Sequence, residues 1–296
     1  MRFFQTLMDS PPRKILQLLK RKLKRRPKAV AFSDEHPCVF VLSTGRVGSM
    51  TLAALLANNS NMVAHHEPRP SLFSMSRAYY QFGDKIPDDF WPYLWQVLRE
   101  DLLNAALLEG RGYVETSPQG TFLAPVIATM VPQVRFIHLV RNPFDVVRSG
   151  VSRQWYNGHF ADRNRIEPRP NDSHESRWAT MTVIEKNLWL WYETNRWIIE
   201  QLKDFPNHRH IRVHAEDMFR GDPKTIEQIS VFCGAESFRS MEVKSILRRP
   251  LNKQVSLVNF SYNTWHSREK DFAMKLLPRL LDVLGYSNLL DTKNSK

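Results

Sequence analysis

Short apolar runs alternate along the chain with longer segments in which apolar residues recur at helical spacing. The apolar runs predict buried strands near residues 38–42, 61–64, 112–117, 134–140 and 211–214. The helical spacing predicts helices at 51–56, 70–82, 88–109, 118–130, 179–202, 223–233 and 268–284, with another from 143 onwards. Strands that alternate with helices are typical of a doubly wound, mainly parallel sheet, so we expect a three-layer α/β fold.

The composition is that of one domain with a full core. The chain has 296 residues, 42% of them hydrophobic. We expect a single domain over residues 37–296, with a polar insertion near 153–178 that closes over the site. The two cysteines, Cys38 and Cys233, stand far apart in apolar surroundings. They are predicted to be core residues, with neither a disulfide framework nor a metal site.

The positive charge is concentrated at the N-terminus. The net charge is +12, and residues 1–28 hold ten Lys or Arg and one Asp, so their +9 leaves about +3 for the rest. We therefore expect no nucleic-acid partner for the folded body. Residues 1–36 are predicted to be a basic tail. Its segment 13–26 sets Leu and Ile opposite Lys and Arg on a helix, which favours an anionic membrane surface; a solvated tail or a helix packed on the domain is the alternative.

The sequence also bears on location. No apolar run approaches the roughly 18 residues of a membrane span. The N-terminus lacks the continuous apolar region of a secretory signal. Together with the few cysteines, these features favour a cytoplasmic protein that reaches the membrane surface through its tail.

Residues 38–52 read as a buried strand, a loop of small residues and a helix. This geometry points backbone N–H groups at a phosphate, and Arg46 adds a bidentate donor. The loop is not a Walker A sequence, because Gly48 is followed by Ser49 rather than by Lys. A tight turn whose glycines serve only backbone geometry is the alternative to phosphate binding.

Two further strand ends carry polar residues. The second strand ends in His65, His66 and Glu67, where the following proline disfavours helix. Such strand ends line the ligand crevice of an open α/β sheet. Glu67 is our first candidate for a general base, followed by His66 and then His65; loop polarity without a catalytic part is the alternative. The strand at 134–140 leads into Arg141, and the helix after it brings Ser149 near Arg141 two turns along.

Three segments resemble blocks of the sulfotransferase superfamily, whose members bind 3′-phosphoadenosine-5′-phosphosulfate (PAPS). Residues 43–51 resemble the 5′-phosphosulfate loop, 140–149 the 3′-phosphate motif, and 213–218 a further block near the last core strand. The resemblance implies a P-loop NTPase-like sulfotransferase fold, PAPS as co-substrate and no metal. It assigns cofactor binding to Gly45, Arg46, Val47, Gly48, Ser49, Met50, Thr51, Arg141, Ser149, Asn252 and Lys253. Many members have Lys at the position of Arg46 and Asp at that of Asn142, so the contact made by Arg46 differs in geometry.

The resemblance also implies catalytic roles. Arg46 would neutralise charge on the bridging oxygen, and Glu67 or His66 would take the proton of an acceptor hydroxyl or amine. A carbohydrate, a lipid headgroup, a small alcohol and a protein tyrosine are all open as acceptors. The competing functions are a P-loop small-molecule kinase, which needs a loop lysine and an acidic magnesium ligand, and a non-catalytic module that binds a membrane surface or an anionic ligand.

Overall fold

The computed structural model describes residues 28–87, 89–248 and 260–290. Its central element is a five-stranded sheet in the order β2-β3-β1-β4-β5, parallel at every strand pair. The strands are β1 (Cys38–Leu42), β2 (Met62–His65), β3 (Gly112–Glu115), β4 (Arg135–Val140) and β5 (His210–His214). The predicted parallel α/β sheet is therefore confirmed. Because β1 lies between β3 and β4, the loop after β1 lies beside the ends of both neighbours.

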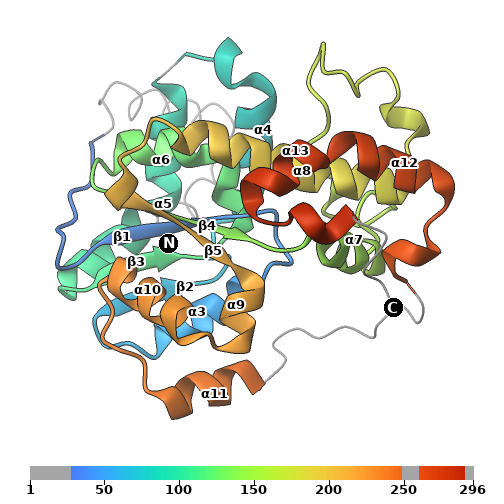
Figure 1. The fold of residues 1–296 in the computed structure, drawn as a ribbon. Helices are drawn as coiled ribbons and strands as arrows, with labels where there is room; N and C mark the ends of the chain where they lie inside the picture. Colours follow the sequence, from blue (N-terminus) through green and yellow to red (C-terminus); the bar gives the residue numbers. More distant parts are fainter. Residues whose placement is uncertain (1–27, 88, 249–259, 291–296) are drawn as a thin grey trace.

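Both faces of the sheet are covered by helices (Figure 1). The side chains of β1 show this directly, since successive residues of a strand point to opposite faces. Val39 and Val41 belong to one buried cluster together with residues of α3 (Ser49–Ala57) and α10 (Pro223–Cys233). Phe40 and its strand neighbours Cys38 and Leu42 belong to another cluster, with α5 and α6. The sheet is thus the middle of three layers.

The remaining helices include two, at Ala215–Arg220 and Ser240–Arg248, that the apolar spacing did not predict. They are α4 (Phe73–Phe82), α5 (Phe90–Leu108), α6 (Ala124–Met130), α7 (Pro143–Ser152), α8 (Val183–Leu202), α9 (Ala215–Arg220), α11 (Ser240–Arg248), α12 (Ser267–Leu276) and α13 (Pro278–Leu284). The helix α8 begins four residues later than predicted because Thr182 and Glu185 form a capping box. Both cysteines are buried and unbonded, as predicted.

Two predicted helices are each divided in the structure. The segment 268–284 forms α12 and α13, because Pro278 has no backbone N–H with which to continue the first helix. The segment 118–130 starts as a 3₁₀ helix (Pro118–Leu123), and α6 begins only at Ala124. The prediction of one continuous helix was wrong in both places.

Several predictions fall outside the described residues. They concern the segment 13–26 of the tail and the residues Asn252 and Lys253. Within the described ranges, no helix is both long and apolar enough to cross a membrane. The predicted insertion is described in full and contains only short 3₁₀ turns, at Asp162–Asn164 and Trp178–Thr180.

Candidate active site

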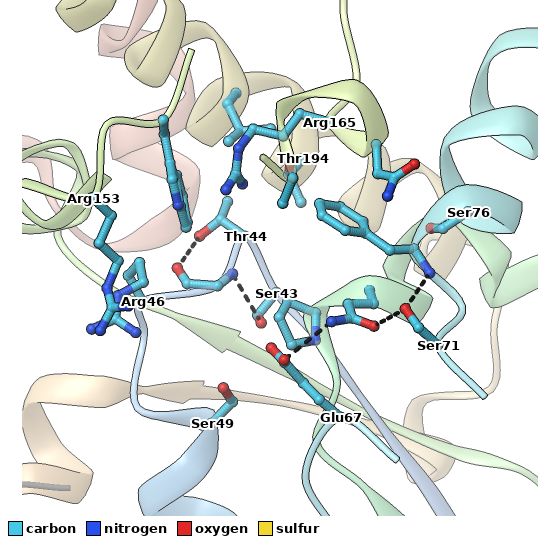
Figure 2. A pocket seen from close by; sticks show the side chains of 18 of the residues that line it. Ser43, Thr44, Arg46, Ser49, Glu67, Ser71, Ser76, Arg153, Arg165 and Thr194 are labelled. Atoms are coloured by element: carbon cyan, nitrogen blue, oxygen red, sulfur yellow. Dashed lines mark hydrogen bonds between the residues drawn. The ribbon is translucent and has the colours of Figure 1, made fainter. Parts of the chain in front are cut away.

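A cavity of about 1010 Å³ opens where the carboxyl ends of β1, β2 and β4 meet. Its wall is built from the loop after β1, the segment after β2, the polar insertion and the inner face of α8 (Figure 2). In an open α/β sheet this edge is where ligands bind. A side chain that contacts a ligand at this edge must therefore line this cavity.

The loop after β1 is held in an unusual backbone conformation. Gly45, Arg46 and Gly48 all have positive φ, at 82°, 61° and 91°. A Cβ on Gly48 would lie 2.5 Å from Cζ of Phe219, so this ring would have to move, and the positive φ would strain any side chain at this position. Gly48 is also the N-cap of α3 and offers no side-chain cap, which leaves the first backbone N–H groups of this helix for another acceptor. The non-glycine strain at Arg46 is of the kind that collects at functional sites.

Arg46 and Arg141 line one end of the cavity, whereas Ser149 is bonded to Arg46 but, like Val47, does not belong to the lining. Nε of Arg46 donates to Oγ of Ser149 at 2.9 Å. Nη1 of Arg141 donates to the backbone oxygen of Arg46 at 3.2 Å, so this guanidinium faces the loop. The structure thus brings together the two segments that the sequence singled out, which are 95 to 103 positions apart.

Positive charge is crowded at this end of the cavity. The pKa of Arg46 is lowered to about 10, first by burial and then by the nearby charges of Arg153 and Arg141. Figure 2 shows the side chain of Arg153 beside that of Arg46, which belongs to the loop. An anion bound here would relieve both the desolvation and the mutual repulsion of these cations.

A second set of contacts fixes Arg141 and its helix. Its backbone oxygen accepts from Nε1 of Trp191, and its Nη2 pairs with Asp145 at 3.0 Å. The backbone N–H of Asn142 donates to Glu216, which also accepts from the hydroxyl of Tyr286. Glu216 was not among the predicted site residues, although it lies within the block 213–218. A carboxylate directly after the last core strand was the available signal.

Glu67 and His66 line the cavity, whereas His65 does not. Nε2 of Gln119 donates to Oε2 of Glu67 at 3.1 Å, and Oε1 of Gln119 accepts from Ser71 at 2.6 Å (Figure 2). This chain fixes which end of the amide faces Glu67. The backbone of Glu67 is left-handed, with φ of 48°. The His65 ring packs against Tyr113 instead, and burial lowers its pKa.

A buried ion pair anchors the segment that carries Glu67. Arg99 and Glu115 have side chains that are 0% and 1% exposed, and they form two hydrogen bonds of 2.7 and 2.9 Å. Nη1 of Arg99 also donates to the backbone oxygen of Pro70 at 2.7 Å. This pair was not predicted, because Arg99 stands among the apolar residues of the predicted helix at 88–109. A lone arginine among them was the only signal.

The polar insertion forms much of the opposite wall. It contributes Trp155, the residues 159–161 and the residues 163–166 to the lining. The Arg165 guanidinium lies 3.9 Å from the centroid of the Trp155 ring, and burial lowers its pKa. The expected movement of this segment over a substrate stays a prediction. Among the described residues, no group of three or more His, Cys, Asp or Glu is placed to hold a metal ion.

Comparison with known proteins adds a family assignment. Residues 37–239 match the model of a family described as the sulfotransferase family. The sulfotransferase domain of the Synechococcus PCC 7002 olefin synthase is 17% identical, with 92% of this chain and 99% of that chain covered and a TM-score of 0.49. The sulfotransferase domain from the curacin biosynthetic pathway is 18% identical, with coverages of 81% and 97% and a TM-score of 0.47. A search of curated proteins found no match.

Proposed function

Since residues 37–239 match that model, the chain belongs to the sulfotransferase family, and we propose that it transfers a sulfuryl group from PAPS to an acceptor hydroxyl or amine. The observation that carries this proposal is the meeting of Arg141 and Ser149 with the loop at Arg46. These two segments would hold opposite ends of one doubly phosphorylated adenosine.

The loop and α3 suit the 5′ end of this nucleotide. Uncapped N–H groups at Ser49 and Met50 face the positive end of a helix dipole, where a phosphate is stabilised. The Ser49 and Thr51 side chains add hydroxyl groups beside them. Arg141 and Ser149 suit the 3′-phosphate, which ordinary adenine nucleotides lack. Each charge-assisted hydrogen bond of this kind contributes about 1.5–3 kcal/mol.

The proton of the acceptor goes to Glu67 in this mechanism. PAPS would supply the sulfuryl group: the bond from sulfur to the phosphate oxygen breaks while a bond from sulfur to the acceptor oxygen or nitrogen forms, and 3′,5′-ADP leaves. Gln119 holds the Glu67 carboxylate in one orientation, and His66 stands beside it, with its Nε2 4.0 Å from Oε1. Arg46 stabilises the negative charge that develops on the leaving oxygen.

Nucleotide selectivity tests the proposal without an acceptor. We expect 3′,5′-ADP to raise the melting temperature far more than ADP does. Arg141→Ala should abolish that difference, whereas Arg239→Ala, an exposed arginine outside the cavity lining, should keep it. Equal shifts with both nucleotides in the unaltered protein would contradict PAPS as the donor. Magnesium-dependent ATP turnover would instead favour a kinase.

We also propose that the tail places the enzyme at an anionic membrane surface on the cytoplasmic side. This part of the proposal rests on the sequence of residues 13–26, which lie outside the described residues. The basic and apolar faces of that segment match the two requirements of interfacial binding, charge attraction and apolar burial.

A further inference from the structure

The cavity is more basic than a nucleotide site requires. Among the described residues that line it, seven are arginines and Glu67 is the one acid. Arg46, Arg141 and Arg153 belong to the nucleotide end. The other four lie on the segments that carry Glu67 and the insertion, where the acceptor must bind: Arg69, Arg77, Arg163 and Arg165. The part of the cavity lined by these four arginines, here called the acceptor side, is therefore positively charged independently of the nucleotide end.

Half of that charge has no partner among the residues that the structure describes. Arg165 pairs with Asp162 at 2.9 Å, and Arg77 lies 3.7 Å from Glu167. Arg69 and Arg163 are both exposed, and neither side chain has an ion pair or hydrogen bond within the described ranges. Two free guanidinium groups at the rim of one cavity attract an anion and select against a cationic or neutral ligand.

Two buried hydroxyl groups also line the cavity. Ser76 on α4 is 2% exposed and Thr194 on α8 is 1% exposed. Both line the cavity (Figure 2), and neither side-chain oxygen has a hydrogen-bond partner among the described residues. Leaving a buried hydroxyl without a partner destabilises the protein, so these groups point to a ligand that donates or accepts hydrogen bonds deep in the cavity. A lipid chain would leave them unpaired.

An aromatic side chain completes this part of the site. Phe160, in the insertion, is 81% exposed and belongs to the lining. It lies beside the ring of His159, at 4.5 Å between centroids. An exposed aromatic ring at the edge of a polar cavity offers an apolar face to a flat apolar surface, such as the C–H face of a sugar ring.

We propose that the acceptor is an acidic saccharide, a sugar that carries carboxylate or sulfate groups as well as the hydroxyl to be sulfated. Its anionic groups bind Arg69 and Arg163, its other hydroxyls reach Ser76 and Thr194, and one ring packs on Phe160. This inference rests on the proposed function and names the substrate class of the same site. An acidic peptide would satisfy the same arginines, so its binding is measured beside that of the saccharide.

A matched pair of ligands separates charge from shape. The full-length protein, saturated with 3′,5′-ADP, is titrated calorimetrically with a hyaluronan tetrasaccharide and with the same tetrasaccharide after its carboxylates are reduced to alcohols. We expect the acidic form to bind at least about tenfold more tightly, with a difference that shrinks as salt rises. Equal affinity, or no binding of either form, would overturn the proposal. So would tighter binding of a glutamate-rich peptide of equal charge.

Substitutions identify which residues cause the preference for the acidic tetrasaccharide. Arg69→Gln with Arg163→Gln should remove most of the preference for the acidic form. Thr194→Val, which keeps the side-chain shape, should weaken both forms equally. Arg279→Gln, an exposed arginine outside the lining, should change neither. The thermal shift with 3′,5′-ADP is measured on the unaltered protein and on every variant. If the unaltered protein shows no shift, the proposed function is contradicted. If it shows the shift but binds both tetrasaccharides equally, only the acidic acceptor is contradicted.

Discussion

Nε of Arg46 and Oγ of Ser149 are joined by a 2.9 Å hydrogen bond across 103 positions of sequence. The bond closes the gap between the loop after β1 and the second turn of α7. The bond uses only a lone pair of the Ser149 oxygen, so the hydroxyl can still donate its own proton to a 3′-phosphate. Nucleotide binding can therefore keep the contact between Arg46 and Ser149. The strained backbone at Arg46 indicates that this side chain is positioned by the loop and not by the bond alone.

Ser149→Ala is expected to lower affinity for 3′,5′-ADP by roughly tenfold, because one hydrogen bond to a charged group is lost. Affinity for 5′-AMP, which lacks the 3′-phosphate, should stay the same. Ser152→Ala is the matched control, since its hydroxyl donates only to the backbone oxygen of Arg148 at the exposed end of the same helix. Calorimetric titration of the three proteins measures the ratio. An equal loss for both nucleotides would place Ser149 outside the 3′-phosphate contact.

Glu67→Gln removes the proposed proton acceptor while keeping the shape of the side chain. We expect the turnover number to fall by about 10² to 10⁴, with nucleotide affinity and melting temperature unchanged. Gln119→Leu should give a smaller loss, because the carboxylate stays but its orientation is no longer fixed. Initial rates with labelled PAPS check both variants. If Glu67→Gln keeps full activity and His66→Asn does not, the base is His66.

Removing one partner of the buried Arg99–Glu115 pair should destabilise the fold, because the other charge is then left buried and unpaired. Arg99→Met leaves a buried carboxylate whose one remaining hydrogen-bond partner among the described residues is the hydroxyl of Tyr113, and we expect a loss of about 3–5 kcal/mol. Adding Glu115→Gln to Arg99→Met should recover part of the lost free energy of unfolding, because the buried charge is removed. Urea unfolding of the single and double variants gives the values. A double variant as unstable as the sum of the singles would show that the two side chains do not act as a pair.

His138 gives the fold a dependence on pH. Its pKa is lowered from 6.5 to about 3, mainly by burial within β4, although the side chain of Asn195 accepts a hydrogen bond from it. The unfolded chain therefore binds a proton between about pH 6.5 and 3 that the folded chain does not. Stability should fall as pH drops through this window, by up to about 1.4 kcal/mol per pH unit. Urea unfolding between pH 7 and 4 measures the slope, and His138→Gln should flatten it.

The order of elements and the place of the site could be predicted because both depend on local patterns. A strand, a loop with two glycines and a helix specify the turn at residues 43–51 without help from the rest of the chain. Parallel topology then requires the ends of β1, β2 and β4 to meet at one edge. Arg46, Glu67 and Arg141 lie there for that reason.

What the sequence did not predict depends on long-range partners. Arg99 could be understood only once Glu115 and the backbone of Pro70 were placed around it. The same is true of Gln119, whose two amide atoms face different residues of another segment. Helix boundaries at Thr182 and Ala124 shifted because capping and proline geometry overrode the apolar spacing.

Removing residues 1–28 should separate location from chemistry. Those residues carry +9 of the net charge, so their loss should abolish binding to vesicles that contain anionic lipid, while sulfuryl transfer to a soluble acceptor continues. Vesicle co-sedimentation at low and high salt measures the first effect, and neutral vesicles serve as its control. Replacing the five residues of the apolar stripe by serine keeps the charge but removes the stripe: Ile15, Leu16, Leu18, Leu19 and Leu23. Binding that survives this change would mean that charge alone holds the tail at the surface, without burial of an amphipathic helix.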